Sequence, residues 1–305
     1  MNINTVPLAT DFANLLAARR LFFGKGAQHE TDYGRQRVAR WIANVSAPLS
    51  GKIEVTGHVR RFIPEKLRSA EPIFYLHGGG LVYYSTEVFS AFLSTLAHIS
   101  GREIRAFDYP KAPETPMAEL VGHLEQQLST ELNHVDAAPC LMGDSVGGLL
   151  TLWFAGSAFS QAFSQIHLLD AAILRWFAEH WFPWCRQQQF DPLASDYAFS
   201  KLPPVVLHTT EYDVLTDEGL AFAALARQAG ASLQHHHHPA LPHDFCLYAG
   251  KLASSRQAVE QIAAALDIEH KFPCKNEVIM SAIEQLSYYQ KNWLMKQTHG
   301  ICIWH

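Results

Sequence analysis

The chain has 305 residues, and 48% of them are hydrophobic, so it can bury a sizeable core in one large domain or two small ones. A formal net charge of −5 provides no basic surface for nucleic acid and no attraction to anionic membranes. No apolar run reaches membrane-spanning length, and residues 1–26 lack the basic start of a secretion signal. We therefore expect no nucleic-acid partner, no transmembrane segment and no secretion signal.

The cysteines give no sign of a disulfide framework. They are odd in number, widely spaced and without a Cys-x-x-Cys pair. We expect reduced thiols and, with them, a cytoplasmic location. The residues concerned are Cys140, Cys185, Cys246, Cys274 and Cys302.

Residues 1–50 are predicted to be helical and to form part of a cap over the core. Apolar side chains recur there at helical spacing, and no stretch alternates as a strand would. The recurring residues are Phe12, Leu15, Leu16 and Leu21, followed by Tyr33, Val38, Trp41 and Ile42.

Residues 51–270 alternate between short apolar strands and helices, which predicts a mostly parallel sheet with helices on both faces. We expect strands within 52–63 and at 72–76, 103–108, 166–170, 202–207 and 233–238, with Pro239 ending the last. Helices are expected at 88–100, 117–132, 216–228 and 254–266, besides one that follows Ser145 to about residue 157. Beyond them, residues 271–305 are predicted to be a helical extension, with helical spacing clearest over 276–296. It would pack on its own domain or form a dimer contact.

The stretch Gly143-Asp-Ser-Val-Gly147 joins an apolar strand end to an apolar helix. At such a nucleophile elbow the serine backbone is strained, and the two glycines let strand and helix pass closely. Ser145 would then be presented to a cleft. Because Gly-x-Ser-x-Gly also occurs in ordinary turns, the interpretation needs partners elsewhere in the chain.

A serine nucleophile needs an imidazole to take its proton and a carboxylate to orient that imidazole. Asp213 follows one predicted strand and His243 follows the next, in the chain order expected of an α/β-hydrolase. Asp170 also ends a predicted strand and is the alternative acid. Asp213 is the better candidate because the motif around it matches better.

The triple glycine Gly78-Gly79-Gly80 follows a predicted strand and His77. Backbone N–H groups of such a loop can approach an oxyanion closely, and Val146 would add another N–H at its helix start. A flexible loop is the alternative interpretation. His77 itself is expected to be a structural, hydrogen-bonding residue.

Together these motifs resemble the hormone-sensitive-lipase-like family of α/β-hydrolase esterases over roughly residues 55–268. The resemblance implies Ser145 as nucleophile, Asp213 as orienting acid, His243 as base, and oxyanion donors from Gly79, Gly80 and Val146. The matching stretches are His77-Gly-Gly-Gly80, Asp108-Tyr-Pro-Lys-Ala-Pro-Glu114, Gly143-Asp-Ser-Val-Gly-Gly148 and Asp213-Val-Leu-Thr-Asp-Glu218.

The chain departs from the family pattern in three places. Asp244 replaces the usual glycine after the histidine, and this carboxylate could raise the histidine pKa or contact the substrate. Leu81-Val-Tyr-Tyr84 follows the triple glycine in place of an aromatic and then a small residue. The stretch between Ser145 and Asp213 is short, which implies a small cap near residues 172–195. Its aromatic residues would line a substrate pocket or simply pack in the core.

The run His235–His238 does not predict a metal site. Successive side chains of a strand face opposite sides, so the four imidazoles cannot converge on one ion. The simpler interpretation of this run is a partly exposed edge strand. We expect no metal.

These features predict an α/β-hydrolase fold and a serine carboxylesterase that hydrolyses small, uncharged, short-acyl esters through an acyl-serine intermediate. The reaction needs no cofactor, and its partner is a small-molecule ester. Alternatives on the same fold are an amidase or deacetylase, for example one resembling an arylformamidase, and a non-catalytic small-molecule receptor. A homodimer is compatible with the sequence.

Overall fold

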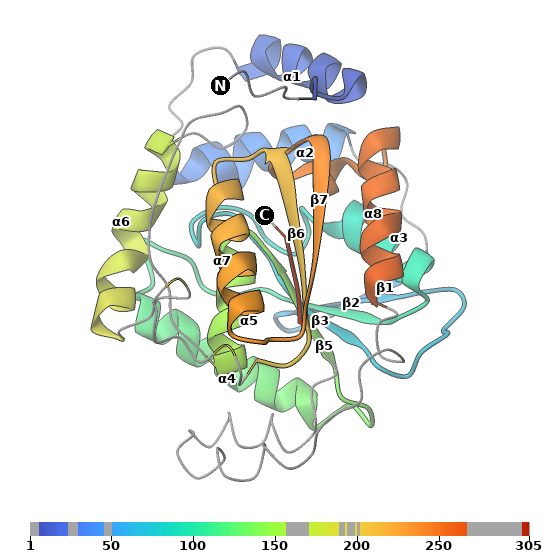
Figure 1. Cartoon of the computed structure of the whole chain (residues 1–305), viewed down its shortest axis with the longest axis vertical. Coiled ribbons are helices and arrows are strands. Elements are labelled where there is room, and N and C mark those ends of the chain that lie inside the picture. The colour runs from blue at the N-terminus through green and yellow to red at the C-terminus, as the bar shows by residue number, and fades with distance from the viewer. Residues whose placement is uncertain are drawn as a thin grey trace.

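A computed structural model describes residues 6–23, 30–45, 51–156, 171–188, 193, 199, 202–266 and 301–304. Its strands are β1 (Lys52–Thr56), β2 (Val59–Ile63), β3 (Ile73–Leu76), β4 (Ile104–Phe107), β5 (Cys140–Asp144), β6 (Val205–Tyr212), β7 (Leu233–Pro242) and β8 (Ile301–Trp304). They form one sheet in the order β1-β2-β4-β3-β5-β8-β6-β7 (Figure 1). From β4 to β7 all neighbours are parallel, whereas β2 pairs antiparallel with β1 and β4. The predicted mostly parallel sheet is confirmed.

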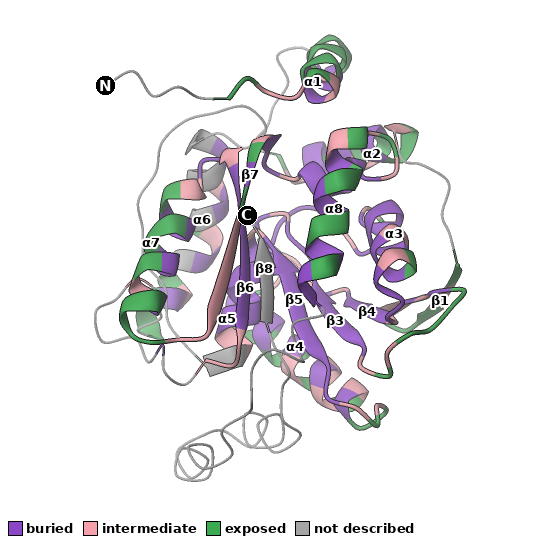
Figure 2. Cartoon of the chain, turned by 45° about the vertical axis from the view of Figure 1, so that its right-hand side comes forward, coloured by how far each residue is buried: buried purple, intermediate pink, exposed green. Residues whose placement is uncertain are grey.

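Helices cover both faces of this sheet, as the alternation predicts (Figure 2). They are α1 (Thr10–Phe23), α2 (Ala39–Val45), α3 (Ser90–Ser100), α4 (Met117–Leu132), α5 (Val146–Gly156), α6 (Ala171–Gln187), α7 (Thr216–Gln228) and α8 (Ala253–Ala265), with the π-helix η1 (Tyr33–Val38) and the 3₁₀-helix η3 (Phe245–Tyr248). Most described residues of the amino-terminal segment are therefore helical, apart from residues 6–9 and 30.

Strand β3 shows why the central strands are apolar throughout. Ile73 and Tyr75 pack in the cluster that contains α3 and α8, whereas Phe74 and Leu76 pack on the opposite face with α4 and α5. All four residues are buried. A strand covered on both faces cannot alternate between apolar and polar residues.

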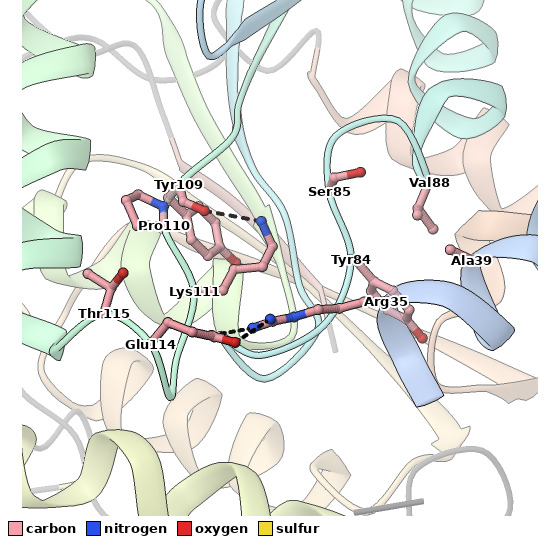
Figure 3. Close-up of a pocket in the computed structure, with 10 residues that line it drawn as sticks. All are labelled: Arg35, Ala39, Tyr84, Ser85, Val88, Tyr109, Pro110, Lys111, Glu114 and Thr115. Atoms are coloured by element: carbon pink, nitrogen blue, oxygen red, sulfur yellow. Dashed lines mark hydrogen bonds and ion pairs between the residues drawn. The ribbon is translucent and has the colours of Figure 1, made fainter. Parts of the chain in front are cut away.

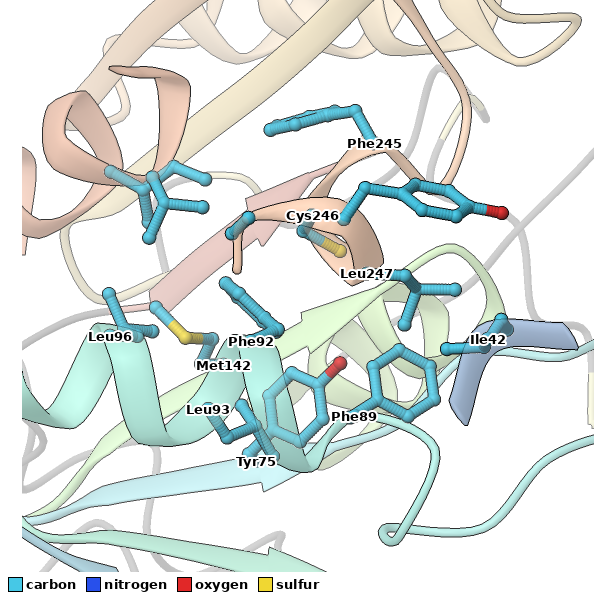
Figure 4. Close-up of a cluster of buried hydrophobic side chains, with 14 of the residues drawn as sticks. Ile42, Tyr75, Phe89, Phe92, Leu93, Leu96, Met142, Phe245, Cys246 and Leu247 are labelled. Atoms are coloured by element: carbon cyan, nitrogen blue, oxygen red, sulfur yellow. The ribbon is translucent and has the colours of Figure 1, made fainter. Parts of the chain in front are cut away.

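The core on the α3 side is dense and aromatic (Figure 4). Phe92 and Leu96 of α3 pack with Met142 of β5 and with Phe245 and Leu247 of η3, and all five are essentially inaccessible. Burial of each such side chain stabilises the fold by about 1.5–3 kcal/mol. This packing fixes the position of η3, which directly follows the loop that carries His243 (the histidine loop).

Two expectations about the strands were wrong. Pro239 does not end the strand, because β7 continues to Pro242 at the edge of the sheet, where an outward-facing backbone position needs no N–H. Residues 301–304 form β8 between β5 and β6 and are not part of a helical extension. The predicted strand at 166–170 and the predicted helix at 276–296 lie outside the described residues.

Cys140, Cys185 and Cys246 are buried free thiols, in accord with the expected reduced state. None of the helices that the structure describes combines the length and apolarity needed to cross a bilayer. The cytoplasmic location and the homodimer stay predictions.

The histidine run follows the strand alternation that the sequence predicts. His236 and His238 stack on His208 of β6, with ring centroids 4.9 and 5.1 Å apart, and His208 Nδ1 lies 2.9 Å from His238 Nε2. His235 and His237 instead contact the Thr209 hydroxyl. Across the described part of the chain, no three ligating side chains converge as a metal site requires.

The stack of His208, His236 and His238 predicts that the folded protein loses stability in acid. Burial, followed by the charges of His236 and His237, lowers the pKa of His238 to about 4. The unfolded chain takes up this proton near pH 6.5, so stability falls as the pH drops from there towards 4. Between pH 7 and pH 5, we expect the unfolding free energy of the wild-type protein to fall by about 2 kcal/mol more than that of His238→Gln, as measured by urea denaturation. His58→Gln, at an exposed turn, is the control. Equal pH dependence in both variants would contradict the prediction.

Candidate active site

Ser145 stands at the turn between β5 and α5 with a φ of 50°. This left-handed conformation is strained for a residue with a side chain. The two glycines are required by close approach, because a Cβ on Gly143 would lie 2.3 Å from the Gly147 oxygen and one on Gly147 would lie 2.0 Å from the Leu76 oxygen. The geometry is that of the nucleophile elbow expected from the sequence.

Asp213 and His243 follow β6 and β7, which are adjacent parallel strands. Both residues therefore lie at the carboxyl ends of the strands, as Ser145 does after β5. His243 Nδ1 lies 2.8 Å from Asp213 Oδ2. Asp213 Oδ1 accepts the Leu215 N–H at 2.9 Å, and the His243 N–H donates to the Tyr212 oxygen at 3.2 Å. The expected acid and base are thus brought together, while Asp170 lies outside the described residues.

The imidazole of His243 is surrounded by negative charge. Burial lowers its pKa, but the carboxylates of Asp213 and Asp244 and the hydrogen bond with Asp213 outweigh that effect and raise the pKa to about 9. Asp144, directly before the serine, raises it further. The elbow and the histidine loop are therefore within electrostatic reach of each other.

Contacts at the other imidazole nitrogen differ from the expected arrangement. His243 Nε2 lies 3.5 Å from Asp244 Oδ1. Among the described residues, His243 forms no hydrogen bond with the Ser145 hydroxyl in this structure. The pairing of Ser145 with His243 stays a prediction.

Asp144 fastens the triple-glycine loop to the elbow. Its Oδ1 accepts the Gly78 N–H at 2.8 Å and the Tyr75 hydroxyl proton. Burial first, and then repulsion by Asp244, raises the pKa of Asp144 to about 7. Because the Gly78 N–H is already bonded to Asp144, Gly78 positions the loop, and its predicted role in oxyanion or substrate binding stays a prediction.

Gly79 and Gly80 complete the loop with φ values of 103° and 63°. At this backbone conformation a side chain would be strained, and a Cβ on Gly80 would lie 2.2 Å from the Phe177 ring. Their N–H groups and that of Val146, at the start of α5, remain the candidate oxyanion donors.

His77 is structural, as expected. Its side chain is fully buried and stacks on Tyr109, with ring centroids 4.2 Å apart. The Tyr109 hydroxyl donates to the His77 oxygen at 2.6 Å. Burial, followed by the Lys111 charge, lowers the His77 pKa to about 4, so the ring is neutral at physiological pH.

Tyr83 links the amino-terminal helices to α6 above the glycine loop. Its ring lies 6.5 Å from that of Tyr33, 5.9 Å from that of Trp176 and 4.9 Å from that of Phe177. A Cβ on Gly34 would lie 2.0 Å from the Tyr83 ring. These contacts favour a cap built from both segments.

A pocket of about 420 Å³ opens beside this loop (Figure 3). Arg35 lines it, and its guanidinium donates to both carboxylate oxygens of Glu114 and to the carbonyls of Val82 and Ala112. Tyr84 lines the pocket and lies within electrostatic reach of Asp244. None of the three proposed triad residues lines it. The lining residues are Arg35, Ala39, Tyr84, Ser85, Val88, Tyr109, Pro110, Lys111, Glu114 and Thr115.

Sequence reasoning missed Tyr75 and the function of Asp144. A tyrosine in a buried strand is indistinguishable from an ordinary core residue in sequence, so nothing revealed that its hydroxyl reaches Asp144. Asp244, by contrast, could be singled out from the sequence because it departs from the family pattern. The sequence did not specify which imidazole nitrogen of His243 it faces.

Comparison with known proteins agrees with this geometry. The sequence profile of the alpha/beta hydrolase fold family matches residues 73–162 and 155–247. An esterase of Gibberella moniliformis is 26% identical over 291 residues, which cover 82% of this chain and 91% of that protein. An ethyl acetate hydrolase of Pseudomonas putida is 25% identical over 240 residues, 64% of this chain and 72% of that protein.

Solved structures show the same fold. A hyperthermophilic esterase from the archaeon Pyrobaculum calidifontis superposes with a TM-score of 0.74 at 22% identity, covering 86% of this chain and 98% of that one. A thermostable esterase from Pseudomonas putida also gives 0.74, at 21% identity over 88% of this chain and 100% of that one. The chain belongs to the alpha/beta hydrolase fold family. Within it, the resemblance to hormone-sensitive-lipase-like esterases is confirmed.

Substitution of Gly147 tests the close approach at the elbow. In Gly147→Ala the new Cβ would meet the Leu76 carbonyl, and backbone cannot give way as a flexible side chain does. We expect a loss of about 3 kcal/mol in unfolding free energy, measured by urea denaturation. Gly122→Ala, at an exposed helix position with no atom within 4 Å of the new Cβ, should stabilise by about 0.5–1 kcal/mol. Equal stability of the two variants would refute the packing argument.

Proposed function

We propose that this chain is a carboxylic ester hydrolase that acts through an acyl-serine intermediate on Ser145, with His243 as base and Asp213 as orienting acid. The observation that carries the proposal is the 2.8 Å contact between His243 Nδ1 and Asp213 Oδ2 at the sheet edge where the strained Ser145 stands. The esterase relatives support the same reaction class.

In the first half of the reaction the neutral His243 Nε2 takes the Ser145 hydroxyl proton while the serine oxygen bonds the ester carbonyl carbon. Asp213 keeps the other ring proton on Nδ1 and stabilises the imidazolium. The N–H groups of Gly79, Gly80 and Val146 stabilise the developing oxyanion. Collapse breaks the bond to the alcohol, which leaves with the proton from Nε2, and water repeats the sequence to release the acid and free Ser145.

The charges around the site favour uncharged ester substrates. Asp144, Asp213 and Asp244 all act electrostatically on His243, so an anionic substrate would be repelled. The Tyr83, Trp176 and Phe177 rings form an apolar wall over the glycine loop. We propose that the cap, made from helices within residues 1–50 and 172–195, limits the site to small, short-acyl esters.

Labelling with a fluorophosphonate probe tests the nucleophile. We expect stoichiometric labelling of the wild-type protein and no labelling of Ser145→Ala, because the probe reacts only with an activated serine. Intact-mass spectrometry measures this directly, and Ser85→Ala in the adjacent pocket is a control that should label fully. A folded wild-type chain that stays unlabelled would favour a non-catalytic receptor.

The pH dependence of esterase activity tests the base. His243 must be neutral to accept the serine proton, and its pKa is raised to about 9. Activity should therefore rise about tenfold per pH unit below pH 9 and level off above it. The measurement is kcat/KM for p-nitrophenyl acetate from pH 6 to 10, corrected for spontaneous hydrolysis. A profile that is flat from pH 6 to 8 would rule out this base.

A further inference from the structure

Asp244 places a second carboxylate on the imidazole of His243. Its Oδ1 lies 3.5 Å from Nε2, on the nitrogen opposite to the one that Asp213 holds. The Asp244 backbone has a φ of 59°, and this left-handed turn immediately precedes η3. The side chain is only 18% exposed, so its attraction to the imidazole is little screened by water.

Other groups around this pair come from several elements. Asp213 from the loop after β6 and Asp144 from β5 add negative charge, while Arg19 of α1 contributes a positive charge that reaches Asp244. The hydroxyls of Tyr75, Tyr84 and Tyr248 are within electrostatic reach of Asp244. One imidazole is therefore shared between carboxylates on both of its nitrogens.

This arrangement has a consequence for the proton on Nε2. The imidazolium form donates towards Asp213 from Nδ1 and faces Asp244 with Nε2–H, so both carboxylates stabilise it. Once solvent takes the Nε2 proton, the nitrogen presents a lone pair to a carboxylate, and that contact becomes repulsive. The neutral ring is then released to accept the Ser145 proton.

We propose that Asp244 is a positioning residue that holds the Nε2–H of the His243 imidazolium and keeps it from Ser145 until the ring loses its proton. The proposal rests on the proposed role of His243 as the base. It explains why, in this structure, Nε2 contacts Asp244 and makes no hydrogen bond with the Ser145 hydroxyl.

The variants Asp244→Asn and Asp244→Gly test the proposal. Both residues tolerate a left-handed φ, so the loop should fold in each, and both remove the charge. Asp217→Asn is the matched control, because it removes an exposed carboxylate in the first turn of α7. Two readouts are needed, one of them independent of activity.

The first readout is proton NMR of the downfield Nδ1–H signal of the His243–Asp213 pair, assigned by its loss in His243→Gln. Its titration gives the His243 pKa in the full chain without any substrate. We expect Asp244→Asn and Asp244→Gly to lower this pKa by about one unit or more, as is typical when an opposite charge is removed at this range, and Asp217→Asn to leave it unchanged. An unchanged pKa in both Asp244 variants would overturn the proposal.

The second readout is the pH profile of kcat/KM for p-nitrophenyl acetate. The acid limb should move to lower pH in both Asp244 variants by the shift seen in NMR, so activity at pH 7 rises about tenfold while the high-pH plateaus lie much closer together. An NMR shift without a matching shift of the limb would overturn the positioning role. If the wild-type chain neither hydrolyses esters nor reacts with the fluorophosphonate probe, the proposed function fails, and the NMR titration still decides whether Asp244 holds the imidazolium.

Discussion

The backbone of Gly147 lies against the carbonyl of Leu76, and the rest of the site depends on this close approach. A single Cβ at residue 147 would lie 2.0 Å from that oxygen, so only glycine lets α5 start directly beside the end of β3. The loop after β3 carries the triple glycine, and the first turn of α5 carries the Val146 N–H. The candidate oxyanion donors therefore come from two distant parts of the chain that this contact brings together. The bonds of Asp144 to Gly78 and Tyr75 fasten the same junction a second time.

The order of strands sets the distance that the proposed triad would span. Strand β8 lies between β5 and β6, so the strand that ends at the serine and the strand that precedes Asp213 are two strand spacings apart. At about 4.8 Å per spacing this is roughly 10 Å. An imidazole with a hydrogen bond at each nitrogen bridges nearly that gap. His243 arrives from the edge strand β7 and reaches back over β6 to Asp213, which explains why its loop must turn sharply after Pro242.

Much of this arrangement could be predicted from sequence because its signals are local. Short-range patterns predict the glycines of the elbow at 143 and 147 and the strand before each proposed site residue. They also predict the edge strand, whose four consecutive histidines alternate between its two faces. Strand β8 could not be predicted, because its four residues gain their place only by pairing with β5 and β6, far away in the chain. Pro239 misled us since its effect depends on whether the strand is central or at the edge. The Nε2 contact of Asp244 depends on a backbone turn that the residue's identity alone does not specify.

The carboxylates around His243 act in opposite directions on its chemistry. With a pKa of about 9, only about one imidazole in a hundred is neutral at pH 7, so few molecules hold a competent base at that pH. The same carboxylates stabilise the imidazolium that forms when the serine proton is taken, which makes the neutral ring a stronger base. They would also repel the oxyanion of the proposed mechanism, so the candidate backbone donors of the glycine loop would have to compensate for the charge of Asp144 and Asp244. In such a site fewer molecules hold a neutral imidazole near pH 7, but each neutral imidazole takes up the serine proton more readily. The charge of Asp244 determines how far these two effects offset each other.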